Sequence, residues 1–234
     1  MLGQLTEITR YLELVMQATL IACFFQWGFS RRYRWFLAYI LAELVRSAVL
    51  FGFDNHSPFY ANAWAFTQPV FWVLQSAAVL ELMLLVYRHR PAAGKFTRQL
   101  FVYYIPAAVL VCLLVQLAET SHPAAKSSLI VAAIIVTKWL SWLLLFMLVA
   151  QEVLYLADAQ PIEHDVVLHR RLLVVYVGIT PGLGAILAYC GGRETGDIAN
   201  FVAEVSWVLC LTCWIVCFRR LKEQRRLRLA EELG

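Results

Sequence analysis

Charged residues are scarce in this sequence, and their scarcity excludes an ordinary soluble domain. Asp, Glu, Lys and Arg make up 15% of the 234 residues, whereas a soluble domain carries about 25%. Apolar residues reach 61%, and the mean hydropathy is +0.66. Most of them lie in seven long segments, each near the roughly 20 residues that a membrane crossing requires. The sequence therefore predicts an all-α polytopic membrane bundle of seven helices.

The apolar segments also lack the residues that usually carry membrane-protein chemistry. All five histidines fall in connecting segments or at segment ends, which disfavours an embedded haem with axial histidines. The last apolar segment has no lysine, so a retinal Schiff base has no counterpart there. Motifs for zinc proteases, serine hydrolases and phosphate-binding loops are absent from the sequence. No catalytic residue, metal site or cofactor is predicted, and an enzyme is disfavoured.

The connecting segments are too short to hold a folded domain of their own. Residues 1–218 are predicted to form one transmembrane domain, and residues 219–234 a short basic cytoplasmic tail. The longest connection, 151–170, mixes acidic, basic and histidine residues and is interpreted as a solvated loop rather than a metal site. No detachable signal peptide and no further signalling domain are expected. The predicted crossings are 8–28, 34–53, 63–87, 99–118, 127–150, 171–190 and 197–219.

Positive charges are almost missing from every second connecting segment. Fifteen of the 20 Lys and Arg residues lie on one side of the predicted bundle and three on the other, with Arg46 and Lys138 inside crossings. The positive-inside rule then places the N-terminus outside and the C-terminus in the cytoplasm. This topology, with attraction to anionic lipid headgroups, also explains the net charge of +4 without any nucleic-acid partner.

Five charged residues inside the crossings are the main candidates for function, because charges in a bilayer are rare and costly. Glu43 and Lys138 are expected near mid-membrane, where they are possible partners of each other. Gln68 and Gln75 add uncharged polar groups at similar depths. These side chains form either an interior polar site open toward the outside or a structural ion-pair network between helices. The five charged candidates are Glu13, Glu43, Arg46, Lys138 and Glu204.

Two further patterns bear on helix shape and on the membrane interface. Gly178, Pro181 and Gly182 form a glycine-flanked proline that predicts either a broken helix lining a site or close helix packing. Trp and Tyr residues near the segment ends, among them Tyr60 and Trp64, are interpreted as an aromatic belt at the headgroups.

The chain resembles a group of bacterial seven-helix membrane proteins. The matching features are the basic turn 31–36, the pair Glu43 and Arg46, and Glu81 followed by the basic segment 87–90. In topology alone it is similar to the seven-helix input modules of bacterial sensor kinases. The resemblance implies a multi-pass protein of the bacterial inner membrane and no particular activity.

Three functions are compatible with this sequence. The first is a sensory or ligand-binding module, in which a small molecule or lipid reaches the intramembrane charges and a separate partner at the cytoplasmic face detects the change. The second is a small transporter or channel, although no internal repeat supports it. The third is an accessory subunit of a larger membrane complex.

Overall fold

The computed structural model describes residues 2–53, 57–88, 91–104, 106–107, 110, 128–157, 163–190 and 193–233. Its described part consists of helices and short turns, with no strand among these residues. The helices are α1 (Leu2–Trp27), α2 (Arg34–Leu50), α3 (Pro58–Val86), α4 (Pro91–Gln99), the π-helix η1 (Leu100–Tyr104), α6 (Ser128–Ala157), α7 (His164–Cys190) and α8 (Arg193–Leu233).

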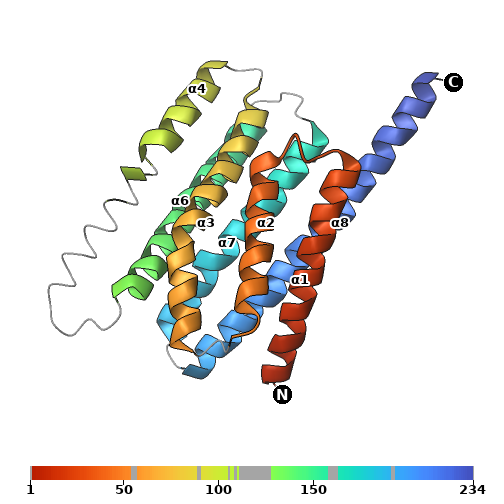
Figure 1. Cartoon of the computed structure of the whole chain (residues 1–234). Helices are drawn as coiled ribbons and strands as arrows, with labels where there is room; N and C mark the ends of the chain where they lie inside the picture. Colours follow the sequence, from red (N-terminus) through yellow and green to blue (C-terminus); the bar gives the residue numbers. More distant parts are fainter. Residues whose placement is uncertain are drawn as a thin grey trace.

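Six of the helices form a closed ring in which each helix packs against the next (Figure 1). The order around the ring is α1, α2, α3, α6, α7 and α8, and α8 contacts α1 again. The short helix α4 lies outside this ring, beside α3. We call the end that holds the N-terminus and the α2–α3 turn the N-terminal end. The opposite end, with the α1–α2 turn and the extended C-terminal part of α8, is the basic end (Figure 1).

The turns between helices follow from local residue chemistry. Gly28 has φ +74° directly after α1, a left-handed conformation that glycine adopts without the penalty of a side chain. Its amide and that of Phe29 bond back to Phe25 and Phe24, the pattern of a Schellman C-cap. At the other end of the bundle, the Ser57 hydroxyl accepts from the Tyr60 amide at 3.1 Å. Pro58 occupies the first turn of α3, where its missing N–H leaves no bond unmade.

Within the described residues, four helical segments are long and apolar enough to cross a membrane: Glu7–Trp27, Pro58–Val86, Ile130–Val153 and Phe201–Glu223. The predicted membrane-helical character is thus confirmed at this coarser level. The predicted crossing 99–118 lies largely outside the described residues. Within it, the structure shows the π-helix η1 and isolated helical residues at 106–107 and 110.

The prediction of a solvated loop at 151–170 is wrong for most of that segment. Helix α6 continues to Ala157 and α7 begins at His164. His169 and Arg170 are buried, with 1% and 0% of their surfaces exposed. The charged residues there suggested a loop, but pairing between helices lets them lie inside helical packing instead.

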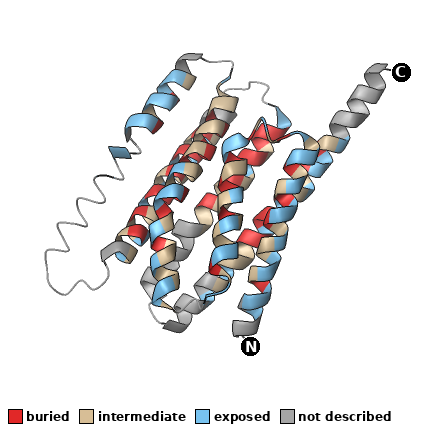
Figure 2. Cartoon of the chain, in the orientation of Figure 1, coloured by how far each residue is buried: buried red, intermediate tan, exposed pale blue. Residues whose placement is uncertain are grey.

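The interior of the ring is filled unevenly along its length. Buried positions line the faces that the helices turn toward one another (Figure 2). Toward the basic end, aromatic rings from α1, α2 and α8 pack against one another in edge-to-face and tilted arrangements. The ring centroids of Phe24 and Phe218 are 5.1 Å apart, and those of Phe36 and Trp214 are 4.8 Å apart. The opposite half of the interior contains a cavity.

Candidate functional site

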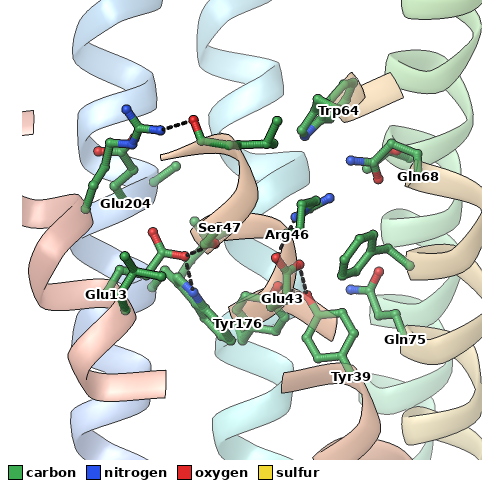
Figure 3. A pocket seen from close by; sticks show the side chains of 18 of the residues that line it. Glu13, Tyr39, Glu43, Arg46, Ser47, Trp64, Gln68, Gln75, Tyr176 and Glu204 are labelled. Atoms are coloured by element: carbon green, nitrogen blue, oxygen red, sulfur yellow. Dashed lines mark hydrogen bonds and ion pairs between the residues drawn. The ribbon is translucent and has the colours of Figure 1, made fainter. Parts of the chain in front are cut away.

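A polar cavity of about 410 Å³ lies inside the ring toward its N-terminal end (Figure 3). All six ring helices contribute side chains to its wall, whereas the described residues of α4 contribute none. The cavity therefore lies within the ring rather than in a groove between two helices. Its polar and aromatic lining includes Arg10, Glu13, Tyr39, Glu43, Arg46, Ser47, Tyr60, Trp64, Gln68, Gln75, Thr137, Ser141, Tyr176, Glu204 and Trp207.

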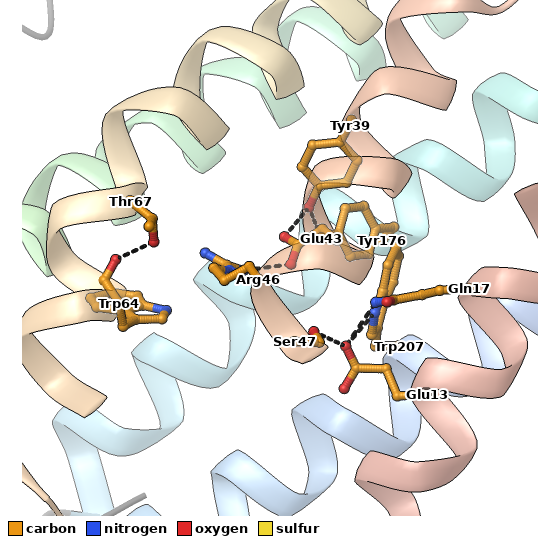
Figure 4. Close-up of polar contacts among 10 residues, drawn as sticks. All are labelled: Glu13, Gln17, Tyr39, Glu43, Arg46, Ser47, Trp64, Thr67, Tyr176 and Trp207. Atoms are coloured by element: carbon orange, nitrogen blue, oxygen red, sulfur yellow. Dashed lines mark hydrogen bonds and ion pairs between the residues drawn. The ribbon is translucent and has the colours of Figure 1, made fainter. Parts of the chain in front are cut away.

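Glu43 has partners on both of its carboxylate oxygens. Its Oε2 atom accepts from Arg46 at 2.6 Å, one turn along α2, and its Oε1 atom accepts from the Tyr39 hydroxyl at 3.1 Å (Figure 4). The Tyr39 and Tyr176 hydroxyls are also hydrogen-bonded to each other. Since Tyr39 donates to Glu43, Tyr176 donates to Tyr39. This chain connects α2 to α7 and leaves Glu43 only 7% exposed.

Arg46 is held from a second side by α3. Its guanidinium carbon lies 3.7 Å from the centroid of the Phe71 ring, a cation–π contact that suits a desolvated arginine. Oriented to match its neighbours, the Gln68 amide oxygen accepts from Arg46 at 3.0 Å and from the Trp64 indole at 2.9 Å. Arg46 is therefore clamped between one carboxylate, one amide and one aromatic face.

Glu13 forms a second polar cluster on the opposite wall. Its Oε1 atom accepts from Gln17 at 2.9 Å, from Ser47 at 3.2 Å and from the Trp207 indole at 3.2 Å (Figure 4). These donors come from α1, α2 and α8, so one carboxylate oxygen holds three helices at a single level. Hydrogen bonds to charged acceptors are stronger than those to neutral ones, and these three bonds partly offset the burial of the Glu13 carboxylate.

Arg10 and Glu204 complete the charges of the cavity. Arg10 donates to the Leu50 carbonyl at 3.2 Å, at the end of α2, and its guanidinium lies 5.4 Å and 5.8 Å from the rings of Phe51 and Tyr60. The Oε2 atom of Glu204 is buried and has no hydrogen-bond partner among the described residues. Of the three carboxylates, Glu204 is thus the one whose hydrogen-bonding capacity is least used.

The structure brings together all of the predicted polar candidates except one. The side chains of Glu13, Glu43, Arg46, Gln68, Gln75 and Glu204 line the same cavity. Lys138 does not line it, although its neighbour Thr137 does. Within the described part of the chain no ion pair involves Lys138, and Arg46 is the cation paired with Glu43. Of the two candidate partners of Glu43, the structure therefore pairs it with Arg46, three residues along α2, and not with Lys138.

The glycine–proline segment does not break its helix. The backbone of α7 remains helical through Gly178, Pro181 and Gly182. A Cβ atom added to Gly178 would lie 3.5 Å from the Leu145 side chain of α6. This contact supports close helix packing at Gly178 rather than an unwound helix lining a site.

Several cavity residues were not identified from the sequence. Tyr60 and Trp64 were assigned to an aromatic belt, but both line the cavity. Tyr176 and Trp207 resemble ordinary apolar residues in their segments. One available signal was the four-residue spacing of Tyr39 and Glu43, which places both on one face of a helix. For the others, only the ring arrangement shows that they face inward.

Ion pairs connect the α1–α2 turn to the start of α7 at the basic end. Arg32, in the α1–α2 turn, contacts Glu163 at 2.5 Å and Asp165 at 3.3 Å. The Tyr33 hydroxyl donates to Asp165 at 3.3 Å. Burial and the neighbouring Asp165 carboxylate raise the pKa of Tyr33 above its usual value near 10, so the hydroxyl keeps its proton.

Two further carboxylates near this end have structural partners. Glu152 is paired with the fully buried Arg170 and contacts Arg171 at 3.4 Å. Glu81 of α3 accepts from the amides of Trp35 and Phe36 at 3.0 and 3.4 Å, which caps the first turn of α2. Among the described residues, no group of three His, Cys, Asp or Glu side chains is arranged to hold a metal ion.

Comparison with family models, with curated proteins and with solved structures finds no match to this chain.

Proposed function

We propose that this chain is a membrane-embedded binding protein whose ring cavity takes a small, positively charged ligand and signals its presence to a separate partner. The cavity volume of about 410 Å³ falls within the roughly 300–1,000 Å³ of small-molecule sites. Its polar groups are held in position by hydrogen bonds from several helices, as a preorganised site requires.

The observation that carries this proposal is the imbalance of charge in the lining. Three carboxylates face two guanidinium groups. Glu43 is neutralised by Arg46, and Arg10 is directed to a backbone carbonyl. Glu204 keeps a buried oxygen with no partner among the described residues. Leaving a buried carboxylate oxygen unpaired is unfavourable, and a ligand ammonium group would supply the missing donor.

Aromatic faces in the lining suit the same class of ligand. Tyr60, Trp64 and Trp207 line the cavity beside the acidic residues, and indole and phenol rings attract cations through their electron-rich faces. An anionic ligand would find Arg10 and Arg46 already engaged. A cation is therefore the ligand charge that this lining favours.

The proposal includes a topology with seven crossings and the N-terminus outside. Successive helices reverse direction from α1 to α3 and again from α6 to α8, whereas α3 and α6 run parallel (Figure 1). Lys and Arg residues collect at the basic end, which supports that end as the cytoplasmic one. The fourth crossing would involve η1 and the residues after it. In this orientation the cavity lies in the outer half of the membrane, and a partner would detect the change at the basic end. Such signalling requires that the ligand bind two conformations differently.

The test compares two small ions of similar size and opposite charge. The purified protein in phosphatidylcholine nanodiscs is heated with either propylammonium or propionate, and the unfolding midpoint is recorded. We expect propylammonium to raise the midpoint, and Glu204→Gln to weaken the underlying affinity about tenfold. Glu223→Gln is the control, because Glu223 lies on the same helix but is exposed and paired with Arg219. Equal shifts with both ions, or no dependence on Glu204, would refute the proposal.

A transporter is the second candidate, favoured by one specific observation. The cavity lies at one end of the ring, while the ion pairs of Arg32 and Arg170 close the other. A site accessible from one side and closed by breakable contacts on the other is the arrangement that alternating access needs. Uptake of labelled propylammonium into proteoliposomes, absent in Glu204→Gln, would favour transport over sensing.

A further inference from the structure

An apolar groove on the outside of the ring reaches the same side chains as the polar cavity. It lies between α2 and α3, has a volume of about 490 Å³, and is floored by small residues such as Ala38, Ala42 and Ala63. Its flanks include Val45 and Val49, which are 57% and 60% exposed. Arg46 is the one charged side chain among the described residues that line it.

Three side chains separate the groove from the cavity. Arg46, Leu50 and Phe71 line both hollows, so one layer of side chains stands between the lipid-facing groove and the polar interior. The guanidinium of Arg46 lies over the Phe71 ring. The contact between α2 and α3 is therefore the place where an apolar surface and a charged interior come closest.

The groove has the length and direction of an alkyl chain that enters from one leaflet. From Leu50 it follows α2 back to Ala38, which is about 18 Å at 1.5 Å per residue. Leu50 ends α2 at the N-terminal end of the bundle, and Ala38 lies four residues after the start of α2, so the groove extends past the middle of this helix. An amphiphile in the adjacent leaflet has the same orientation, with its headgroup toward that end and its tail toward the bilayer centre.

We infer that the ligand of this protein is an amphiphile with a positively charged headgroup, whose head binds in the ring cavity and whose single alkyl chain lies in the α2–α3 groove. This inference rests on the proposed function for the headgroup and adds the tail and its path. The acidic excess of the cavity selects the charge of the head, and Glu204 offers it an unused acceptor. The uncharged walls of the groove select the tail. The chain crosses between them over Arg46, Leu50 and Phe71.

The experiment uses dodecylammonium carrying a diazirine near the end of its chain, in phosphatidylcholine nanodiscs. After irradiation, the cross-linked residues are mapped by mass spectrometry, with and without excess unmodified dodecylammonium. We expect competed cross-links on residues 38–50 and 63–74. Two groove-filling variants, Ala42→Leu and Ala63→Leu, should reduce the competed cross-linking about tenfold. Ala48→Leu is the matched control, because Ala48 is exposed on α2 and does not line the groove.

The short ion separates the failure of this inference from the failure of the proposed function. Propylammonium has no tail, so its stabilising effect should persist in Ala42→Leu and Ala63→Leu, which also shows that these variants fold. Cross-links that are not competed, or that spread evenly over the lipid-facing surfaces of α1, α6 and α8, would show that the probe behaves as ordinary bilayer lipid. That result would overturn the groove as the tail site but would not affect the cavity as the headgroup site. If neither propylammonium nor dodecylammonium binds the wild-type protein, both the proposed function and this inference are overturned.

Discussion

The two halves of the ring interior differ in the side chains that line them: one half is aromatic and the other is polar and charged. Toward the basic end, rings such as Phe24, Phe36 and Trp214 fill the space between helices, and Trp214 is fully buried. Toward the N-terminal end, carboxylates and guanidiniums surround a cavity of about 410 Å³. The same six helices pass through both regions. The difference therefore lies in which side chains they present at each level.

This contrast separates stability from function within a single bundle. Lipid is as apolar as leucine, so membrane helices associate through close packing and polar contacts rather than through burial from water. The aromatic half supplies the packing. The polar half contains a cavity and therefore has fewer packing contacts. Hydrogen bonds such as those to Glu13 and Glu43 connect its helices instead. We expect the aromatic half to determine stability and the polar half to determine binding.

The largest expected effect is the loss of packing in the aromatic half. Trp214→Ala should lower the free energy of unfolding by about 3–5 kcal/mol, because it leaves a cavity among rings that cannot collapse. Unfolding by sodium dodecyl sulfate in mixed micelles would measure this change. Trp139→Ala is the control, since Trp139 is 61% exposed toward lipid. An equal loss of unfolding free energy in both variants would contradict the expectation that the aromatic half of the interior determines stability.

Next in size is the coupling between the two charges of α2. Glu43→Gln and Arg46→Met should be non-additive, with a coupling free energy of about 1–3 kcal/mol, because each leaves the other without its partner at a largely buried position. Glu43→Gln combined with Lys138→Met should instead be additive within about 0.5 kcal/mol. A double-mutant cycle of unfolding free energies measures both. Coupling with Lys138 instead of Arg46 would contradict the arrangement described for the cavity.

A smaller effect concerns the turn that closes the basic end. Tyr33→Phe removes the hydrogen bond to Asp165 and should cost about 1 kcal/mol near neutral pH. The pKa of Tyr33 is raised in the folded protein, so its stabilising contribution is present below about pH 10 and declines above it, where the unfolded chain loses its proton first. The difference in unfolding free energy between wild type and variant, followed from neutral to alkaline pH, tests the sign. A difference that grew with pH would contradict it.

The smallest expected change in stability lies in the cavity wall. Glu204→Gln should alter the unfolding free energy by less than about 0.5 kcal/mol, because its buried Oε2 atom has no hydrogen bond to lose within the described part of the chain. The same substitution at Glu152 removes the carboxylate paired with Arg170 and should be clearly more destabilising. Parallel unfolding measurements on the two variants would check this. Equal losses would show that Glu204 has a structural role that the described contacts do not reveal.

Much of this architecture could be predicted from composition, but less of the site. The apolar segments and the scarcity of charge indicated helices in a membrane, and the rarity of buried charges pointed to Glu13, Glu43, Arg46 and Glu204. The pairing of those charges was predictable only in part, because the three-residue spacing of Glu43 and Arg46 places both on one face of a helix. Arg46 and Lys138 were both candidate partners of Glu43, because both were expected at a similar depth in the membrane. Depth along a helix does not show the direction in which a side chain points.

Aromatic residues show the same limit. Near the ends of apolar segments, Tyr60 and Trp64 fit an aromatic belt as well as a cavity wall, because the two differ only in the rotation of the helix about its axis. Hydrophobic periodicity usually reveals that rotation in a soluble helix. Here the outer face is apolar too, so the pattern along the chain carries little information about which face is inside.

By itself, the sequence determined that this protein is helical and built for a bilayer, and which of its residues are unusual there, because the hydrophobic length of a crossing and the penalty for an isolated charge are properties of single segments. Only the tertiary structure decided that six helices close into a ring, that Arg46 rather than Lys138 neutralises Glu43, and that Tyr60, Trp64 and Trp207 share one cavity with Glu204. Those outcomes depend on the relative rotation of neighbouring helices, which is set by packing between segments far apart in the chain.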